Sequence, residues 1–187
     1  VPTIFILGGS QCAVKINEAV LSSLPELTAF ANVIHQTGRT NLKDVEAVSH
    51  VVLANNPHAS RYHPIDYLDQ VSMQRAASIA DIVVSRAGAN SISEIGLWKK
   101  PAILIPIPES ISHDQRMNAY GYAETGAAIV IEEENLAPNI FVAEIQRILH
   151  EHALAKRMGE AAKGFTDPDA ARILAHEVLA MALAHES

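Results

Sequence analysis

Short continuous runs of apolar residues alternate along the chain with longer segments in which apolar residues recur every three or four positions. The short runs have the length of strands that are buried on both faces, whereas the recurring spacing is typical of helices with one buried face. The pattern predicts strands at Thr3–Leu7, Asn32–His35, Ile65–Leu68, Asp81–Ser85, Pro101–Pro106 and Ala127–Ile131.

The predicted helices follow these strands after short connections. Helical spacing begins behind Ser10, a suitable N-cap, and we expect this helix to end near Pro25. The segment Leu42–Ala54 has helical spacing, although its last five residues alone could form a strand, and we favour a helix. Further helices are predicted up to Ala80, from near Ser91, up to Glu124 and from Pro138 onward, with breaks at Gly164 and Pro168.

Strand and helix therefore alternate about six times, as in a parallel sheet with helices on both faces. Hydrophobic residues make up 49% of the 187 residues and charged residues 19%, so the chain can bury a sizeable core and is not a disordered protein. We expect one doubly wound, Rossmann-like α/β domain over residues 1–187, with a terminal helix at about 165–187.

Charge and cysteine content narrow the function. The net charge is −7 and no basic cluster occurs, which argues against nucleic acid as a partner. Cys12 is the single cysteine, so an internal disulfide and a cysteine-rich zinc site are excluded, and a reducing cytoplasm fits. The histidines are scattered instead of standing at ligand spacing, and we expect no bound metal.

The apolar start of the chain, Val1–Leu7, is too short for a signal sequence, and no other stretch has the length of a transmembrane helix. Because the sequence begins almost directly inside a predicted strand, we expect it to be a piece of a longer protein.

Three loops with polar or glycine-rich sequences, at 8–12, 86–94 and 110–118, each follow a predicted strand. The carboxyl ends of parallel strands share one edge of a sheet, so these loops should lie together where ligands bind. In the first loop, Gly8 and Gly9 permit close approach of the backbone to an anion. The loop matches neither a dinucleotide fingerprint nor a phosphate loop with its lysine, and a simple turn explains it about equally well.

The second loop is more specific. Gly88 and the amides near Asn90 and Ser91 begin a helix suited to a diphosphate, and Glu94 follows on the same helical face. There the carboxylate could accept hydrogen bonds from both hydroxyls of a ribose. A capping box formed by Ser91 and Glu94 explains the same spacing, and spacing alone slightly favours this cap.

The third loop places Gln115 and Asn118 where they could bind sugar hydroxyls. His113 and Asp114 could suggest acid–base chemistry, but an exposed helix cap explains this pair better. We recognise no catalytic triad, no zinc-protease motif and no pair of catalytic carboxylates. The chain therefore has the features of a nucleotide-diphosphate site without an evident catalytic base.

Six stretches of the sequence form one ordered set: GGSQ at 8–11, HQTG at 35–38, ADIVVSRAGANSISEI at 80–95, KPAILIPIP at 100–108, DQRMNA at 114–119 and GAAIVIEE at 126–133. Together they resemble the C-terminal domain of the family 28 glycosyltransferases, which include the peptidoglycan N-acetylglucosaminyltransferases. The resemblance covers nearly the whole chain and is most specific in its central segment.

The resemblance implies UDP-N-acetylglucosamine as the donor substrate. It places Ser10 and Gln11 near the donor phosphates and sugar, and it assigns Glu94 to the ribose, against the cap. It also implies that Gln115 contacts the N-acetylglucosamine and that Asn118 supports this loop. The remaining implied contacts are the diphosphate with Gly88, Ala89, Asn90 and Ser91, and the uracil edge with the backbone of Leu68 or a neighbour.

The resemblance further implies half of a GT-B glycosyltransferase, an inverting enzyme that needs no metal and forms lipid II from lipid I in peptidoglycan synthesis. An N-terminal domain absent from this sequence would carry the acceptor site and the base, contact residues 165–187, and attach the enzyme to the cytoplasmic face of the bacterial inner membrane. This chain alone would bind the UDP-sugar without transferring it. Two departures from the family pattern, Cys12 in place of glycine and Asp114 in place of glutamine or histidine, leave the donor affinity open.

Three other functions compete with this interpretation. The chain could be a donor-binding subunit that a separate acceptor-binding chain completes, as in some two-subunit glycosyltransferases. A UDP-sugar epimerase would require added carboxylates and histidines in the cleft, which the sequence does not offer. A purely structural Rossmann domain is disfavoured because three ligand-type loops share one edge.

Overall fold

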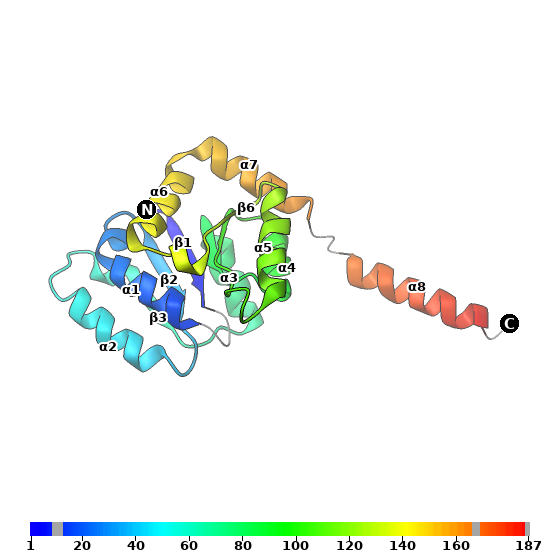
Figure 1. The fold of residues 1–187 in the computed structure, drawn as a ribbon, viewed down its shortest axis with the longest axis horizontal. Coiled ribbons are helices and arrows are strands. Elements are labelled where there is room, and N and C mark those ends of the chain that lie inside the picture. Colours follow the sequence, from blue (N-terminus) through cyan, green and yellow to red (C-terminus); the bar gives the residue numbers. More distant parts are fainter. Residues whose placement is uncertain (9–12, 166–168, 186–187) are drawn as a thin grey trace.

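The computed structural model describes residues 1–8, 13–165 and 169–185. A six-stranded, all-parallel sheet forms its centre, with strand order β3-β2-β1-β4-β5-β6 (Figure 1). The order reverses between β1 and β4, as in a doubly wound Rossmann-like fold, so the predicted fold class is confirmed. The strands are β1 (Thr3–Leu7), β2 (Asn32–Gln36), β3 (Tyr62–Ile65), β4 (Ile82–Ser85), β5 (Ala102–Leu104) and β6 (Ala128–Val130).

Helices cover both faces of the sheet (Figure 1). One cluster of buried apolar side chains lies between the sheet and helices α1 and α6. A second cluster lies between the sheet and helices α3, α4 and α5. The helices are α1 (Ala13–Phe30), α2 (Leu42–Val52), α3 (Gln70–Ile79), α4 (Ala89–Trp98), α5 (His113–Glu124), α6 (Pro138–His150), α7 (His152–Lys163) and α8 (Ala170–His185), with 3-10 turns η1 (Ala59–Arg61) and η2 (Glu133–Asn135).

The strand β1 lies in the middle of the sheet, between β2 and β4. Its last residue, Leu7, lies opposite Gln36 of β2 on one side and opposite Ser85 of β4 on the other. Consecutive residues of β1 alternate between the two cores, with Ile4 and Ile6 in one and Phe5 and Leu7 in the other. Burial on both faces explains why a continuous apolar run predicted this strand correctly.

The first helix is longer than its sequence suggested. We predicted an end near Pro25, but α1 continues to Phe30 with this proline inside it. Proline removes one backbone hydrogen bond, yet Leu27, in the last turn of the helix, is completely buried. The Thr28 hydroxyl also donates to the Leu24 carbonyl at 2.8 Å. Burial of this turn thus outweighs the local cost of the proline.

The third strand was placed three residues too late. We predicted a strand at Ile65–Leu68, whereas β3 spans Tyr62–Ile65. β3 is an edge strand paired only with β2, so Pro64 is tolerated there. The buried Tyr62 anchors it opposite Val33.

The ambiguous segment after β2 is confirmed as a helix, α2. Gly164 ends α7 as predicted, while the second predicted break, Pro168, lies outside the described residues. The predicted terminal helix is α8, which stands away from the sheet (Figure 1), and its described side chains are exposed. None of the helices in the described parts of the chain is long and apolar enough to cross a membrane.

Candidate functional site

The carboxyl ends of β1, β4 and β5 meet at one edge of the sheet. Leu7 pairs with Ser85, and Ser85 pairs with Leu104, so the three strands end side by side. The loops that follow these strands therefore share one edge, as the sequence predicted. Within the first loop, residues 9–12 lie outside the described residues, and the predictions for Ser10, Gln11 and Cys12 fall there.

The amino end of α4 presents free backbone donors at this edge. Gly88 is the N-cap, with φ −66° and ψ 147°, and the first intrahelical bond runs from the Ile92 N–H to the Gly88 carbonyl at 3.0 Å. The amides of Ala89, Asn90 and Ser91 therefore have no intrahelical acceptor. As the N-cap residue, Gly88 has no side chain that could accept from these amides. Such an uncapped end carries partial positive charge and suits an anion such as a phosphate.

Glu94 does not cap this helix. α4 begins at Ala89, two residues before the predicted start, so Ser91 is the third helical residue and Glu94 lies in the second turn. The capping box that spacing slightly favoured is therefore wrong. In the described parts of the chain no group donates a hydrogen bond to the Glu94 carboxylate, and partial burial raises the pKa of this carboxyl. Glu94 is free to accept hydrogen bonds from a ligand.

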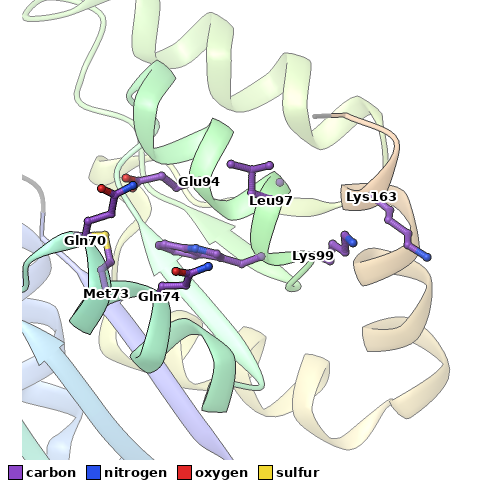
Figure 2. Close-up of a pocket in the computed structure, with 9 residues that line it drawn as sticks. Gln70, Met73, Gln74, Glu94, Leu97, Lys99 and Lys163 are labelled. Atoms are coloured by element: carbon purple, nitrogen blue, oxygen red, sulfur yellow. The ribbon is translucent and has the colours of Figure 1, made fainter. Parts of the chain in front are cut away.

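A pocket of about 420 Å³ opens beside Glu94 between α3 and α4. Figure 2 shows Glu94 and Gln70 close together at one end of this pocket, on facing helices. Lys99 and Lys163 line its other end (Figure 2), and Trp98 also lines the pocket. The carboxylate and the carboxamide thus form a polar end that lies next to the loop before α3.

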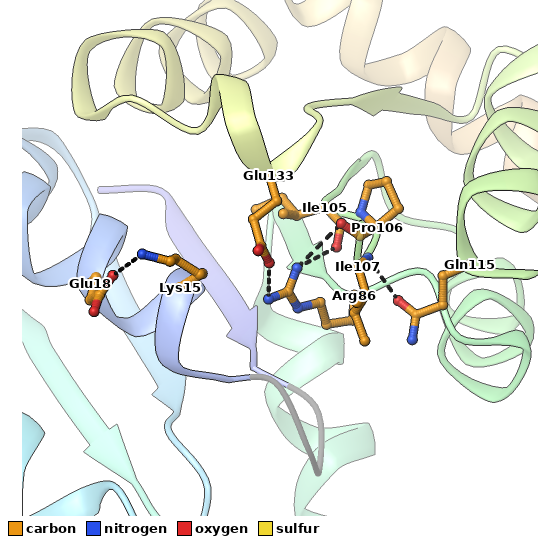
Figure 3. Close-up of polar contacts among 8 residues, drawn as sticks. All are labelled: Lys15, Glu18, Arg86, Ile105, Pro106, Ile107, Gln115 and Glu133. Atoms are coloured by element: carbon orange, nitrogen blue, oxygen red, sulfur yellow. Dashed lines mark hydrogen bonds and ion pairs between the residues drawn. The ribbon is translucent and has the colours of Figure 1, made fainter. Parts of the chain in front are cut away.

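Gln115 and Asn118 both lie on α5 and hold the backbone of neighbouring loops. The Gln115 Oε1 atom accepts from the Ile107 N–H at 3.3 Å (Figure 3), and Asn118 Nδ2 donates to the Ala87 carbonyl at 3.4 Å. Asn118 thereby supports the turn that leads into α4. Asp114, in the first turn of α5, is exposed.

The buried Arg86 joins three loops of the site, a role that the sequence analysis missed. The side chain leaves the end of β4 and is only 3% exposed. Its guanidinium forms an ion pair with Glu133 and donates to the carbonyls of Ile105 and Pro106 at 3.2 and 3.4 Å (Figure 3). A charged residue directly after a fully buried strand is the signal that could have revealed it.

The turn after β2 holds the loop after β3. The Thr37 and Gly38 amides donate to the carbonyls of Ile65 and Asp66 at 2.8 and 3.1 Å. Gly38 has φ 89°, a conformation that favours glycine. In this loop Leu68 is buried, and its backbone N–H donates to Gln36 Oε1 at 3.0 Å. The segment HQTG at 35–38 thus organises the loop next to the pocket.

A buried polar network supports the same turn from inside. Asn17 Nδ2 donates to the Thr37 carbonyl at 3.1 Å, so Asn17 Oδ1 must accept from His35 Nε2 at 3.0 Å. The Tyr62 hydroxyl then donates to His35 Nδ1 at 2.9 Å. Complete burial lowers the pKa of His35 from 6.5 to about 3, so the ring is neutral. In this chain of hydrogen bonds, the donor and the acceptor of each bond are therefore defined.

Metal-ligating side chains do not gather at this edge: within 1–8, 13–165 and 169–185, no three His, Cys, Asp or Glu residues are grouped to hold an ion. The groups that converge and can face a ligand are backbone amides, carboxamides and one partly buried carboxylate. Such a set can bind the phosphates and hydroxyls of a nucleotide.

Comparison with known proteins agrees with the family resemblance of the sequence. The model of the glycosyltransferase family 28 C-terminal domain matches residues 3–174. A Chlorobium luteolum protein named UDP-N-acetylglucosamine–N-acetylmuramyl-(pentapeptide) pyrophosphoryl-undecaprenol N-acetylglucosamine transferase is 35% identical over 98% of this chain. The match covers 48% of that relative, so the chain spans about half the length of the curated relatives it matches.

Two solved structures resemble the fold. The crystal structure of Acinetobacter baumannii MurG has a TM-score of 0.76 at 25% identity, covering 93% of this chain and 48% of that one. The S. aureus MnaA–UDP co-structure has a TM-score of 0.71 at 15% identity, covering 95% of this chain and 45% of that one. The second likeness, at this low identity, concerns the fold alone.

Proposed function

The chain belongs to glycosyltransferase family 28, whose C-terminal domain it contains, and we propose that it binds UDP-N-acetylglucosamine as the sugar donor. The full enzyme would then transfer N-acetylglucosamine to lipid I and form lipid II. The names of the similar transferases support the donor and the reaction class. The observation that carries the proposal is the uncapped end of α4 at the meeting point of β1 and β4, with Glu94 one turn further on.

The diphosphate would lie at the amides of Ala89, Asn90 and Ser91. As the bond between sugar and phosphate breaks, negative charge grows on the departing UDP. Fixed backbone donors stabilise this charge without having to reorganise, which lowers the barrier. A divalent cation is not needed in this arrangement, because the helix end supplies the positive potential. Ser10 and Gln11, in the glycine loop after β1, would complete the phosphate and sugar contacts.

The ribose would bind at Glu94. A carboxylate with no partner in the described parts of the chain accepts two hydroxyl hydrogen bonds, and such charge-assisted bonds are strong. Gln115 and Asn118 would serve the sugar side of the site, where they already fix the loops around Ile107 and Ala87.

The acceptor and the catalytic base would belong to an N-terminal domain outside this sequence. The curated relatives are about twice as long as this chain, and the difference in length supports a division of roles between two domains. We propose that the enzyme works as a peripheral protein on the cytoplasmic face of the inner membrane, and that this chain alone binds donor without transferring the sugar.

Isothermal titration calorimetry tests the proposal. The wild-type chain is titrated with UDP, UDP-N-acetylglucosamine and UDP-glucose, and the same titrations are made with Glu94→Ala. Loss of the ribose contact should cost about 1–3 kcal/mol, or roughly 5- to 150-fold in affinity. Glu124→Ala, an exposed carboxylate at the far end of α5, is the control and should bind normally.

Each result has a clear meaning. Absence of UDP binding by the wild type would overturn the proposed function. Equal affinity for UDP-glucose and UDP-N-acetylglucosamine would overturn the donor assignment. Unchanged binding by Glu94→Ala would remove Glu94 from the ribose site. Transfer to a lipid acceptor by this chain alone would contradict the division of labour.

A further inference from the structure

Thr37, in the turn after β2, joins two helices to the end of β3. Its amide donates to the Ile65 carbonyl at 2.8 Å. Its own carbonyl accepts from two carboxamides, that of Asn17 in α1 at 3.1 Å and that of Asn41, the N-cap residue of α2, at 3.0 Å. Thr37 is completely buried, so these bonds are shielded from water. The position of the loop that follows β3 therefore depends on how this turn is held.

The hydroxyl of Tyr62 stands at the far end of the buried hydrogen bonds that reach Thr37. The Thr37 carbonyl can only accept, so Asn17 directs its Nδ2 to Thr37 and its Oδ1 to His35. His35 then carries its proton on Nε2, and its Nδ1 accepts from the Tyr62 hydroxyl at 2.9 Å. His35 is completely buried and Tyr62 is 8% exposed. Removal of this hydroxyl would leave Nδ1 as a buried acceptor that has lost its donor.

The loop after β3 leads directly into α3, which forms one wall of the pocket. α3 begins at Gln70, and the side chain of its N-cap Asp69 accepts from the Ser72 N–H at 2.7 Å. Gln70 lies close to Glu94 of the facing helix α4 (Figure 2). α4 follows β4 and α3 follows β3, with β1 and β2 between these two strands in the sheet. The spacing of Gln70 and Glu94 thus depends on where the loop after β3 is held.

We propose that Tyr62 is a positioning residue for the ribose end of the donor pocket, an inference that rests on the proposed function. Its hydroxyl keeps His35 in one tautomer, and this tautomer secures the carboxamide that holds the Thr37 carbonyl. A buried network with all its bonds made is rigid, so the turn keeps the amino end of α3 in place. Gln70 is thereby held beside Glu94, where the ribose would bind.

Calorimetry with UDP and 2′-deoxy-UDP tests this role. The deoxy nucleotide lacks one of the hydroxyls that Glu94 would bind, so the wild type should bind UDP about 10-fold more tightly. In Tyr62→Phe the ring and its packing remain, but His35 Nδ1 loses its donor. UDP affinity should fall about 3- to 10-fold, and the preference for UDP over 2′-deoxy-UDP should fall with it, because the ribose end is no longer held.

Tyr122→Phe is the matched control. Tyr122 on α5 is also a buried tyrosine, but within the parts of the chain that the structure describes its hydroxyl has no hydrogen-bond partner. Removal of this hydroxyl should change neither the UDP affinity nor the preference for UDP. All titrations are made at a temperature where each variant is fully folded, so that a change in affinity does not reflect a loss of folded protein.

Nitrogen NMR of the His35 ring is a second measurement and needs no nucleotide. The wild type should show the tautomer protonated at Nε2, and Tyr62→Phe should show a mixture of both tautomers. The signals are assigned by their absence in His35→Gln. A wild-type ring protonated at Nδ1 would overturn the proposal.

The nucleotide titrations separate this proposal from the proposed function. An unchanged preference for UDP in Tyr62→Phe would overturn the role of Tyr62, while UDP binding by the wild type would leave the proposed function standing. Equal affinity of the wild type for UDP and 2′-deoxy-UDP would overturn both the ribose contact at Glu94 and the role of Tyr62. Absence of UDP binding by the wild type would overturn the proposed function and this proposal together.

Discussion

Arg86 Nη2 and Glu133 Oε2 lie 2.6 Å apart, and this ion pair joins the end of β4 to the turn η2 behind the site. The guanidinium is nearly inaccessible to water, and it also donates to the backbone that follows β5. One buried cation therefore sets the relative positions of three loops.

Replacing the anion of this pair should destabilise the fold. In Glu133→Gln the buried guanidinium loses its counter-charge but keeps its carbonyl partners, so we expect a loss of roughly 1–3 kcal/mol in the free energy of unfolding. Urea denaturation measures this loss. The exposed neighbour Glu134→Gln is the control and should change stability by less than about 0.5 kcal/mol. Equal stability of both variants would contradict a structural role of the ion pair.

His35 should make the protein sensitive to acid. Burial lowers its pKa from 6.5 to about 3, so between these values the unfolded chain takes up a proton that the native state refuses. The free energy of unfolding should therefore fall as the pH drops below 6.5, by up to about 1.4 kcal/mol per pH unit, and the effect should be absent above 6.5.

Urea titrations from pH 7 to pH 4 test this expectation. His35→Gln should be less stable than the wild type at pH 7, because it breaks the network, but its stability should depend less on pH. His50→Gln, an exposed histidine on α2, should keep the wild-type pH dependence. The same pH slope in His35→Gln and the wild type would contradict the assignment.

Glu94 should be a site where binding and stability oppose each other. Burial raises its pKa above 4.5, so the native state holds the proton more readily than the unfolded chain. The protonated carboxyl therefore stabilises the fold, and this contribution to the free energy of unfolding is lost as the pH rises through the raised pKa. Glu94→Gln should raise the melting temperature at pH 7, change it little well below pH 4.5, and weaken UDP binding. A lower melting temperature at pH 7 would argue that Glu94 stabilises the fold.

Two glycines in helices should respond in opposite ways to alanine. A Cβ atom at Gly121 would meet nothing within 4 Å, so Gly121→Ala should add about 0.5–1 kcal/mol through helix propensity. A Cβ atom at Gly159 would lie 3.0 Å from the backbone carbonyl of Lys99, where α7 approaches the end of α4. Gly159→Ala should therefore lower the melting temperature. Equal gains in both variants would show that the two helices can move apart freely.

The sequence predicted the strands that are buried on both faces, because a continuous apolar run has few other structures available. Thr3–Leu7 and Ile82–Ser85 are examples. It misplaced β3, an edge strand that contains Pro64 and has a partly exposed face. It also ended α1 at Pro25, since the burial that carries the helix further depends on contacts made by the folded sheet.

The sequence predicted those parts of the site that depend on one local segment. It missed those parts that depend on contacts between segments far apart in the chain. The helix that begins after Gly88 was predicted from its own sequence to within two residues. Whether Glu94 caps that helix depended on a two-residue shift of the helix start, which spacing does not fix. The bond from Leu68 to Gln36 depends on the pairing of β2 with β3, and the pair of Arg86 and Glu133 depends on that of β5 with β6.

The placement of β1 between β2 and β4 has a consequence for synthesis of the chain on the ribosome. When the segment up to about residue 80 has emerged, β1, β2 and β3 can already pair, but one edge of β1 still lacks its neighbour β4. An apolar strand with a free edge is prone to pair with other chains. The nascent protein is therefore most vulnerable to aggregation until β4 arrives, and the phosphate end of the site exists only from that moment.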